Sequence, residues 1–328
     1  MSTVFLIGNG FDLNCGIKTS YQDAYDGYVK TESNSPLLEC FKKEILEREI
    51  DTWGDFEVAM SKYATKLSNE SDLLKCLRDF KLYLCQYLMN EQTKFYNQLT
   101  EGKDVTDRVC QEMNKSFSTF YRDITESITQ KMIGRAAGNM SYIGAISFNY
   151  TSVFDRLYNM VSYSDSPDVV HIHGCLDLDI SDIALGMDNE TQLDLPYPVS
   201  NKTKRGFIKP LYNQEYNIQR VNDAYRMIKE ANTICIYGMT LGASDISWRN
   251  LVIECIDKNP NLHVFLYKYD LANKKYAFAD ERMDDEEEEK YKLFAEWELN
   301  ETPKYLNQIH IPCGKNIFNI GEILASTK

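Results

Sequence analysis

The sequence contains no apolar run of the roughly 18 residues that a membrane-spanning helix needs. Its first residues have the pattern of a buried strand and lack the basic region of a secretion signal. The nine cysteines are scattered and include no CxxC pair, which argues against a disulfide framework and against a structural zinc site. These absences predict a cytoplasmic protein with reduced thiols and no membrane contact.

Positive charge is also scarce. Lys and Arg number 36 against 49 Asp and Glu, which gives a net charge of −13 and makes nucleic acid a poor partner. The basic stretch NKTKRGFIK (Asn201 to Lys209) is interpreted as a solvated loop rather than a nucleic-acid groove. With 43% hydrophobic and 12% aromatic residues, the 328-residue chain can still bury a full core, in one large α/β domain or two smaller ones.

Six short apolar runs are rich in β-branched and aromatic residues and lack clean alternation, which is typical of strands buried on both faces. They lie at Thr3–Ile7, Tyr142–Phe148, Val169–Ile172, Thr233–Tyr237, His263–Tyr267 and, more weakly, Asn316–Ile320. Helical segments separate several of them. This order predicts an α/β fold with a doubly wound, mostly parallel, Rossmann-like sheet.

The long stretch between the first two predicted strands has a helical period instead. Apolar residues recur there every three or four positions, in two sets: Leu73, Leu77, Phe80, Leu84 and Leu88, then Met113, Phe117, Phe120, Ile124 and Ile128. Such stripes need a packing partner, and we interpret them as core rather than as a cofactor site. We expect a helical subdomain at 31–138, inserted into a Rossmann-like nucleotide-binding domain formed by 1–30 and 139–328.

A glycine-rich turn follows the first predicted strand. Gly8-Asn9-Gly10 comes directly after the strand, and Gly16 follows. Glycine lets backbone N–H groups approach an anion, which is typical of nucleotide sites. The spacing is neither GxGxxG nor that of a P-loop, and a plain tight turn explains these glycines equally well. Asp12 is an odd neighbour for a phosphate: it suits ribose hydroxyls, or it caps the following helix.

The second and third predicted strands end in polar residues. Asn149 could hold a ribose, an amide or an attacking water, or satisfy local backbone as an ordinary turn residue. His173 could act as a general base, although a strand histidine is more often a satisfied core residue. His171 would share a strand face with His173, but no third residue has the spacing of a metal ligand.

The fourth predicted strand leads into Gly238, Thr240 and Asp245. Gly238 and Thr240 could contact a second phosphate or ribose, and Asp245 serves equally well as the N-cap of the next helix. In a parallel sheet, all four of these strand ends meet at the edge where doubly wound folds bind their ligands.

Taken in order, these stretches resemble the bacteriophage abortive-infection AbiH family and, more distantly, the sirtuin-like NAD-binding superfamily. The AbiH-like elements are LIGNGFDLNCGIKTSY from Leu6, WGDFE from Trp53, SFNYT from Ser147, HIHG from His171, LGMD from Leu185 and YGMTLGASD from Tyr237. The resemblance covers most of the chain. It implies a bacterial phage-defence protein.

The sirtuin-like resemblance implies NAD or a related nucleotide, whose N-glycosidic bond would be hydrolysed without a metal. His173 would be the general base, and Asn149 would position the water or the ribose. The residues assigned to the nucleotide are Gly8, Asn9, Gly10, Asp12, Gly16, Thr19, Tyr150, Gly174, Gly238, Thr240 and Asp245.

The sequence departs from the sirtuin pattern at two positions in these stretches. Asp12 stands where sirtuins have serine, and Thr151 replaces the aspartate that would hold the carboxamide. The four-cysteine zinc module of sirtuins is missing, which argues strongly against a protein deacylase.

Two other functions stay open. The first is a non-catalytic nucleotide sensor whose helical insertion engages a phage-encoded trigger, a host partner or a second copy of the chain. The second is a metal-dependent hydrolase built from Asp12, His171, His173, Asp188 or Glu57. Because Asp55 and Glu57 lie about 200° apart around a helix, they would not share a face, and we interpret Glu57 as a helix-face or capping residue.

Overall fold

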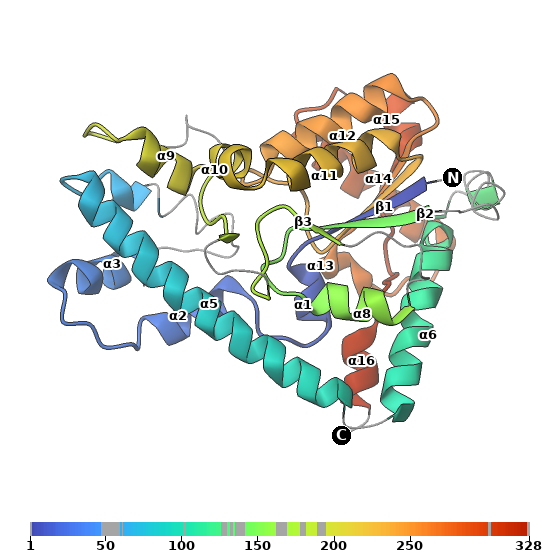
Figure 1. The fold of residues 1–328 in the computed structure, drawn as a ribbon. Coiled ribbons are helices and arrows are strands. Elements are labelled where there is room, and N and C mark those ends of the chain that lie inside the picture. Colours follow the sequence, from blue (N-terminus) through green and yellow to red (C-terminus); the bar gives the residue numbers. More distant parts are fainter. Residues whose placement is uncertain are drawn as a thin grey trace.

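The computed structural model centres on a six-stranded, all-parallel sheet (Figure 1). It describes residues 2–46, 60, 62–100, 103–125, 130–131, 134, 142–161, 169–177, 182–188, 195–300 and 303–326. The strands are β1 (Ser2–Ile7), β2 (Tyr142–Ser147), β3 (Val170–His171), β4 (Thr233–Tyr237), β5 (His263–Tyr267) and β6 (Ile309–His310). Their order in the sheet, β3-β2-β1-β4-β5-β6, is typical of Rossmann-like folds and confirms the predicted fold class.

Helices cover both faces of this sheet. The helices in the described residues are α1 (Gly10–Asn14), α2 (Tyr21–Tyr28), α3 (Pro36–Leu46), α5 (Glu70–Thr100), α6 (Lys103–Thr119), α8 (Val153–Val161), α9 (Asn201–Phe207), α10 (Lys209–Tyr216), α11 (Ile218–Glu230), α12 (Ile246–Lys258), α13 (Tyr269–Ala272), α14 (Ala279–Glu296), α15 (Pro303–Gln308) and α16 (Ile320–Ala325). One face packs against α1, α6, α8 and α16, and the other against α11, α12, α14 and α15 (Figure 1). Strand residues alternate between these two cores because successive side chains point to opposite faces.

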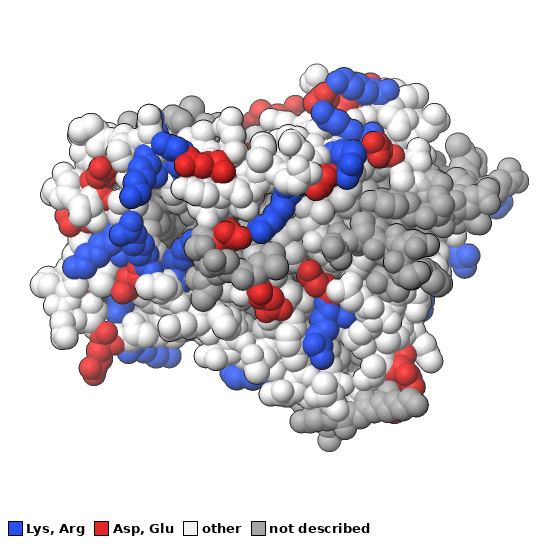
Figure 2. Space-filling view, in the orientation of Figure 1, with Lys and Arg blue, Asp and Glu red and all other residues white. Residues whose placement is uncertain are grey.

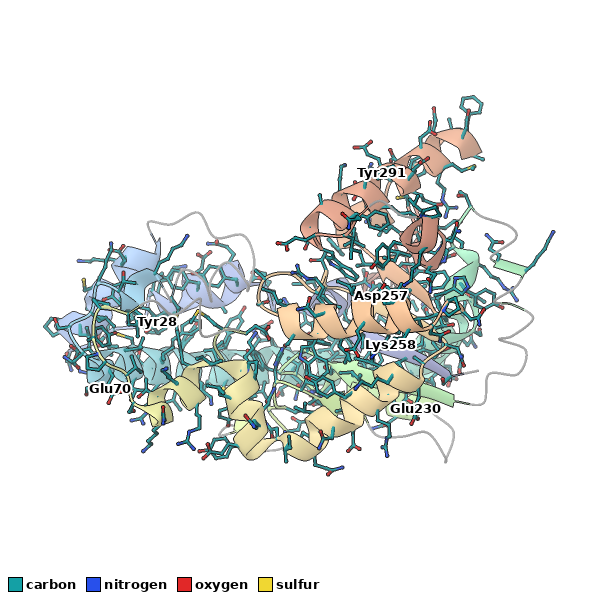
Figure 3. All side chains as sticks on the ribbon, turned by 90° about the horizontal axis from the view of Figure 1, so that it is seen from above. Tyr28, Glu70, Glu230, Asp257, Lys258 and Tyr291 are labelled. Carbon is teal, nitrogen blue, oxygen red and sulfur yellow. The ribbon has the colours of Figure 1, made fainter. Side chains whose placement is uncertain are left out.

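The helices α2 to α6 are inserted between β1 and β2. The first apolar stripe predicted there is confirmed, since all five of its residues are buried in α5. With α2 and α3, this helix forms a third core that lies beside the sheet. Figure 3 shows Tyr28 of α2 and Glu70 of α5 on one side of the molecule, with Asp257 and Lys258 of α12 on the other. The division into two domains stays a prediction, and Trp53 to Glu57 lie outside the described residues.

The second apolar stripe is only partly helical. The helix α6 ends at Thr119, and a short 3₁₀ turn, Phe120–Arg122, follows. The Phe120 carbonyl accepts both from the Asp123 N–H at 3.1 Å, which closes this turn, and from the Tyr267 hydroxyl at 2.6 Å, a tertiary contact at the end of the helix. Phe120 and Ile124 are nevertheless buried, as core residues of a turn. Ile128 lies outside the described residues.

The sixth strand was predicted in the wrong place. Residues 316–319 form a loop that leads into α16, whose first residue is Ile320, and Phe318 has a φ of +57°, which a strand cannot hold. Its ring packs on Phe5, Phe11 and Phe154, so the apolar character of this run reflects core packing. The actual edge strand β6 has two residues, too few for a sequence period.

The surface face in Figure 2 mixes acidic and basic side chains. Among the described residues, no helix combines the length and the apolar character needed to cross a bilayer.

Candidate active site

A cavity of about 740 Å³ lies at the carboxyl ends of the strands, above the junction of β1 and β4. In this strand order the chain reverses direction at that junction, where doubly wound sheets place their ligands. Its volume is in the range of small-molecule sites. Every residue predicted for catalysis or for the nucleotide lines it except Gly16 and Gly174. The insertion adds Tyr21 and Leu88 to the wall.

The glycines of the first turn serve close packing between two loops. The Gly8 N–H donates to the Tyr237 carbonyl and the Gly10 N–H to the Gly238 carbonyl, both at 2.8 Å. A Cβ on Gly10 would lie 2.5 Å from the Gly238 Cα. These two N–H groups are therefore engaged with the end of β4. Gly16 ends α1 with a φ of +79°.

Asp12 joins the β1 and β2 loops instead of capping α1, whose N-cap residue is Asn9. The buried carboxylate accepts from the Asn149 amide at 3.2 Å and from the Thr151 hydroxyl at 2.5 Å. The same amide donates to the Gly8 carbonyl at 3.1 Å. Burial raises the pKa of Asp12 to about 7, against the lowering effect of both hydrogen bonds. The two departures from the sirtuin pattern, Asp12 and Thr151, thus contact each other.

His173 and Asp245 form a buried pair on the other side of the cavity. The His173 Nε2 lies 3.0 Å from the Asp245 Oδ1, and Ser244 donates to the other carboxylate oxygen. Burial alone would raise the pKa of Asp245, but Lys209 and His173 outweigh it and hold it at about 2. Burial and Lys209 together lower the pKa of His173. The imidazole is therefore neutral at pH 7 beside an ionised carboxylate.

This protonation state fixes the tautomer of His173. An ionised carboxylate only accepts, so Nε2 carries the proton and Nδ1 has a lone pair. The Nδ1 atom is buried and has no hydrogen-bond partner in the described part of the chain. The pair thus places a base, oriented by a carboxylate, in the cavity wall.

Asp245 is available for this pairing because another residue caps α12. It occupies the N-cap position, as the alternative interpretation expected, but its side chain makes no capping hydrogen bond. Asp188 accepts instead from the Ser247 N–H at 2.8 Å and from its hydroxyl at 2.7 Å. Asp188 of the LGMD stretch therefore does not line the cavity but caps α12, which leaves the Asp245 side chain for His173.

The remaining predicted residues hold the cavity walls together. The Asn9 amide donates to the Thr19 carbonyl, the Tyr150 hydroxyl to the Ala184 carbonyl, and the Thr240 hydroxyl to Glu296. Gly174 has a φ of +86°, and a Cβ there would meet the Asp182 carbonyl oxygen at 2.3 Å. The backbone conformation and the close approach of Asp182 therefore explain the glycine at position 174 without a ligand contact.

The sequence profile of the family described as Bacteriophage abortive infection AbiH matches residues 4–267. The chain belongs to the AbiH family. A search of curated proteins finds no match. The matched range runs from β1 to the end of β5, so it includes every strand that ends at the cavity. The role of this AbiH chain is accordingly phage defence by abortive infection.

Lys209 is the residue of this AbiH site that the sequence missed. The basic stretch predicted as a solvated loop forms α9 and the start of α10, and Lys209 is buried in the cavity wall. Its ammonium lies 4.0 Å from Asp245 and 3.4 Å from the Ser244 carbonyl. The Lys209 backbone N–H donates to the Met187 carbonyl, and this pairing with the LGMD stretch places Lys209 in the cavity wall. The only sequence signal for Lys209 as a site residue is its position in the basic stretch Asn201 to Lys209.

His171 does not join His173. The strand β3 ends at His171, so the alternation that would place both rings on one face stops there. His171 pairs with Asp155 and does not line the cavity. In the described residues, no group of three His, Cys, Asp or Glu side chains could hold a metal ion.

We expect Asp12→Asn to stabilise this AbiH protein at alkaline pH. An Asp whose pKa is raised to about 7 in the folded state costs stability as pH rises from about 4 to 7, because the unfolded state ionises first. Asparagine can still accept from Asn149 and donate to Thr151, without the buried charge. Relative to wild type, the free energy of unfolding should rise by about 2–3 kcal/mol between pH 5 and pH 8. Urea denaturation at both pH values measures this, and an equal difference at the two would contradict it.

Proposed function

We propose that this AbiH protein binds NAD or a related nucleotide in the cavity and hydrolyses its N-glycosidic bond. The observation that carries the proposal is the buried lone pair on the His173 Nδ1, in a cavity wall at the ligand-binding edge of a Rossmann-like sheet. The distant sirtuin-like resemblance of the same stretches supports NAD as the nucleotide.

In the proposed reaction, the bond between the ribose C1′ and the nicotinamide nitrogen breaks. Its electron pair neutralises the pyridinium, so nicotinamide leaves uncharged. A water oxygen bonds to C1′ and gives its proton to the His173 Nδ1, which yields ADP-ribose. Asp245 stabilises the imidazolium that forms, as a carboxylate does in other oriented histidine pairs.

Asp12 and Asn149 would hold the ribose on the other side of the cavity. A carboxylate with a pKa of about 7 can accept from ribose hydroxyls, and its charge would favour the positive charge that develops on the sugar. The Asn149 amide is held between Gly8 and Asp12 and would fix the depth at which the ribose sits. The Gly8 and Gly10 N–H groups already donate to backbone carbonyls. The turn would therefore let the nucleotide approach the backbone closely, because it has no side chains in the way, rather than donate hydrogen bonds from these two groups.

A contact between the insertion and the site favours a second candidate, the non-catalytic sensor. Gln92 of α5 accepts from the Ser152 N–H at 2.8 Å and donates to Asp177 at 2.7 Å. Ser152 follows Thr151, whose hydroxyl contacts Asp12. A phage-encoded trigger or second copy that bound α5 would therefore act on the Asp12 side of the cavity.

The test is to mix the purified protein with NAD and measure nicotinamide release and thermal stability. We expect release, together with stabilisation by about 2.7 kcal/mol at 100 times the dissociation constant. If NAD stabilises the protein but nicotinamide is released neither by the purified protein nor after extract of phage-infected cells is added, the hydrolase is overturned and the sensor is supported. Neither effect with NAD, NADP, ATP or ADP-ribose would overturn both functions.

A further inference from the structure

His171 is held by acceptors on both of its ring nitrogens. Its Nδ1 lies 3.1 Å from the Asn149 carbonyl oxygen, and its Nε2 lies 2.9 and 2.8 Å from the two Asp155 carboxylate oxygens. A carbonyl and an ionised carboxylate only accept hydrogen bonds. Both nitrogens therefore carry protons, and the ring is an imidazolium, in contrast to the neutral ring of His173.

The other titratable groups that face this ring are Cys175 and Asp12. Burial alone would lower the pKa of His171, but Asp155, with Cys175, raises it to about 10. The imidazolium thus persists throughout the physiological range and is 4% exposed.

The contact with Asn149 links His171 to the cavity. The Asn149 N–H donates to the Ser147 hydroxyl at 3.2 Å, and its carbonyl accepts from His171. With the backbone held at both ends, the side chain reaches the Gly8 carbonyl and Asp12. His171 does not itself line the cavity and acts there through Asn149.

We infer that His171 and Asp155 are positioning residues: Asp155 keeps the ring in place, and the His171 N–H to the Asn149 carbonyl aims the Asn149 amide at Gly8 and Asp12. The kinetic consequence of this inference rests on the proposed function. Its structural content does not.

Two variants separate this role from general stability. His171→Phe fills a similar volume and donates no hydrogen bond. Asp155→Asn is the matched control, because its amide can donate to the Nε2 of a neutral His171 that keeps its Nδ1–H on the Asn149 carbonyl. Both variants remove the His171–Asp155 charge pair, but His171→Phe also leaves the Asp155 carboxylate unpaired, so the free energy of unfolding is measured for each and the exchange of Asn149 is compared at equal stability.

The first measurement is a spectrum of the protein labelled with ¹⁵N-histidine at pH 7.5, where the sequence offers four histidines to assign. We expect two protonated nitrogens on His171 in wild type and one in Asp155→Asn. A single protonated nitrogen on His171 in wild type would overturn the inference.

The second measurement follows Asn149. Hydrogen exchange of its side-chain amide should become about tenfold faster in His171→Phe and stay near wild type in Asp155→Asn. Unchanged exchange in His171→Phe would overturn the positioning role. Turnover of NAD should fall by about 10²-fold in His171→Phe, mainly in kcat, and little in Asp155→Asn. If wild type does not turn over NAD, the proposed function fails, and the spectrum and the exchange rates still decide this inference.

Discussion

Replacing His173 with glutamine should lower the rate of nicotinamide release by about 10²- to 10⁴-fold and leave the protein folded. The glutamine amide can still donate to Asp245, so the buried carboxylate keeps a partner. It has no basic lone pair that could take the proton of an attacking water. The loss should appear in kcat at saturating NAD, with melting temperature and affinity for NAD nearly unchanged.

His263→Gln is the matched control for this experiment. His263 is the first residue of β5, at the amino edge of the sheet, where its Nδ1 lies 3.0 Å from the His310 Nε2. The same substitution there should leave nicotinamide release near the wild-type rate. Wild-type turnover in His173→Gln would remove the observation on which the proposed hydrolysis rests.

The location of the site could be predicted from the sequence, because it follows from topology. Short apolar runs separated by helices predict a parallel sheet, and the polar residues that end these runs must then meet at its carboxyl edge. Asn149, His173 and Asp245 come from three different loops and do meet there. This prediction needed no side-chain geometry.

The pairing inside the site could not be predicted, because it depends on long-range contacts. Asp245 stands at a helix N-cap, and local rules assign it to capping. That assignment fails because the Ser247 N–H donates to Asp188, which lies 57 positions before Asp245 in the sequence. Lys209 likewise lies in the wall because the chain around it pairs with Met187.

Asp12 and Thr151 illustrate the same limit. Each looked unfavourable for a sirtuin-like site when judged alone, one as an added charge and the other as a lost one. In the structure the Thr151 hydroxyl donates to the Asp12 carboxylate, so the two residues form one contact between the first and the second loop. A contact across 139 positions carries no local signal.

Gly10→Ala and Gly238→Ala should each destabilise the protein without ligand. The alanine Cβ at Gly10 would meet the Gly238 Cα at 2.5 Å, and the one at Gly238 would meet the Phe11 nitrogen at 2.6 Å. Both neighbours are backbone atoms and cannot rotate away, so overpacking should cost about 1–3 kcal/mol. Gly238 also has a φ of +74°, which should add about 1–2 kcal/mol for an L-residue.

Urea denaturation of the ligand-free protein measures these losses, with Gly206→Ala as the control. Gly206 lies in α9, and a Cβ there has no atom within 4 Å, so alanine should stabilise the helix by about 0.5–1 kcal/mol. A glycine that served only a phosphate would behave differently: its alanine variant would lose affinity for NAD and keep its stability. Such a result at Gly10 would contradict the packing role. A loss of stability there would mean that the turn resembles a phosphate loop because two loops must cross closely at the switch point of the sheet.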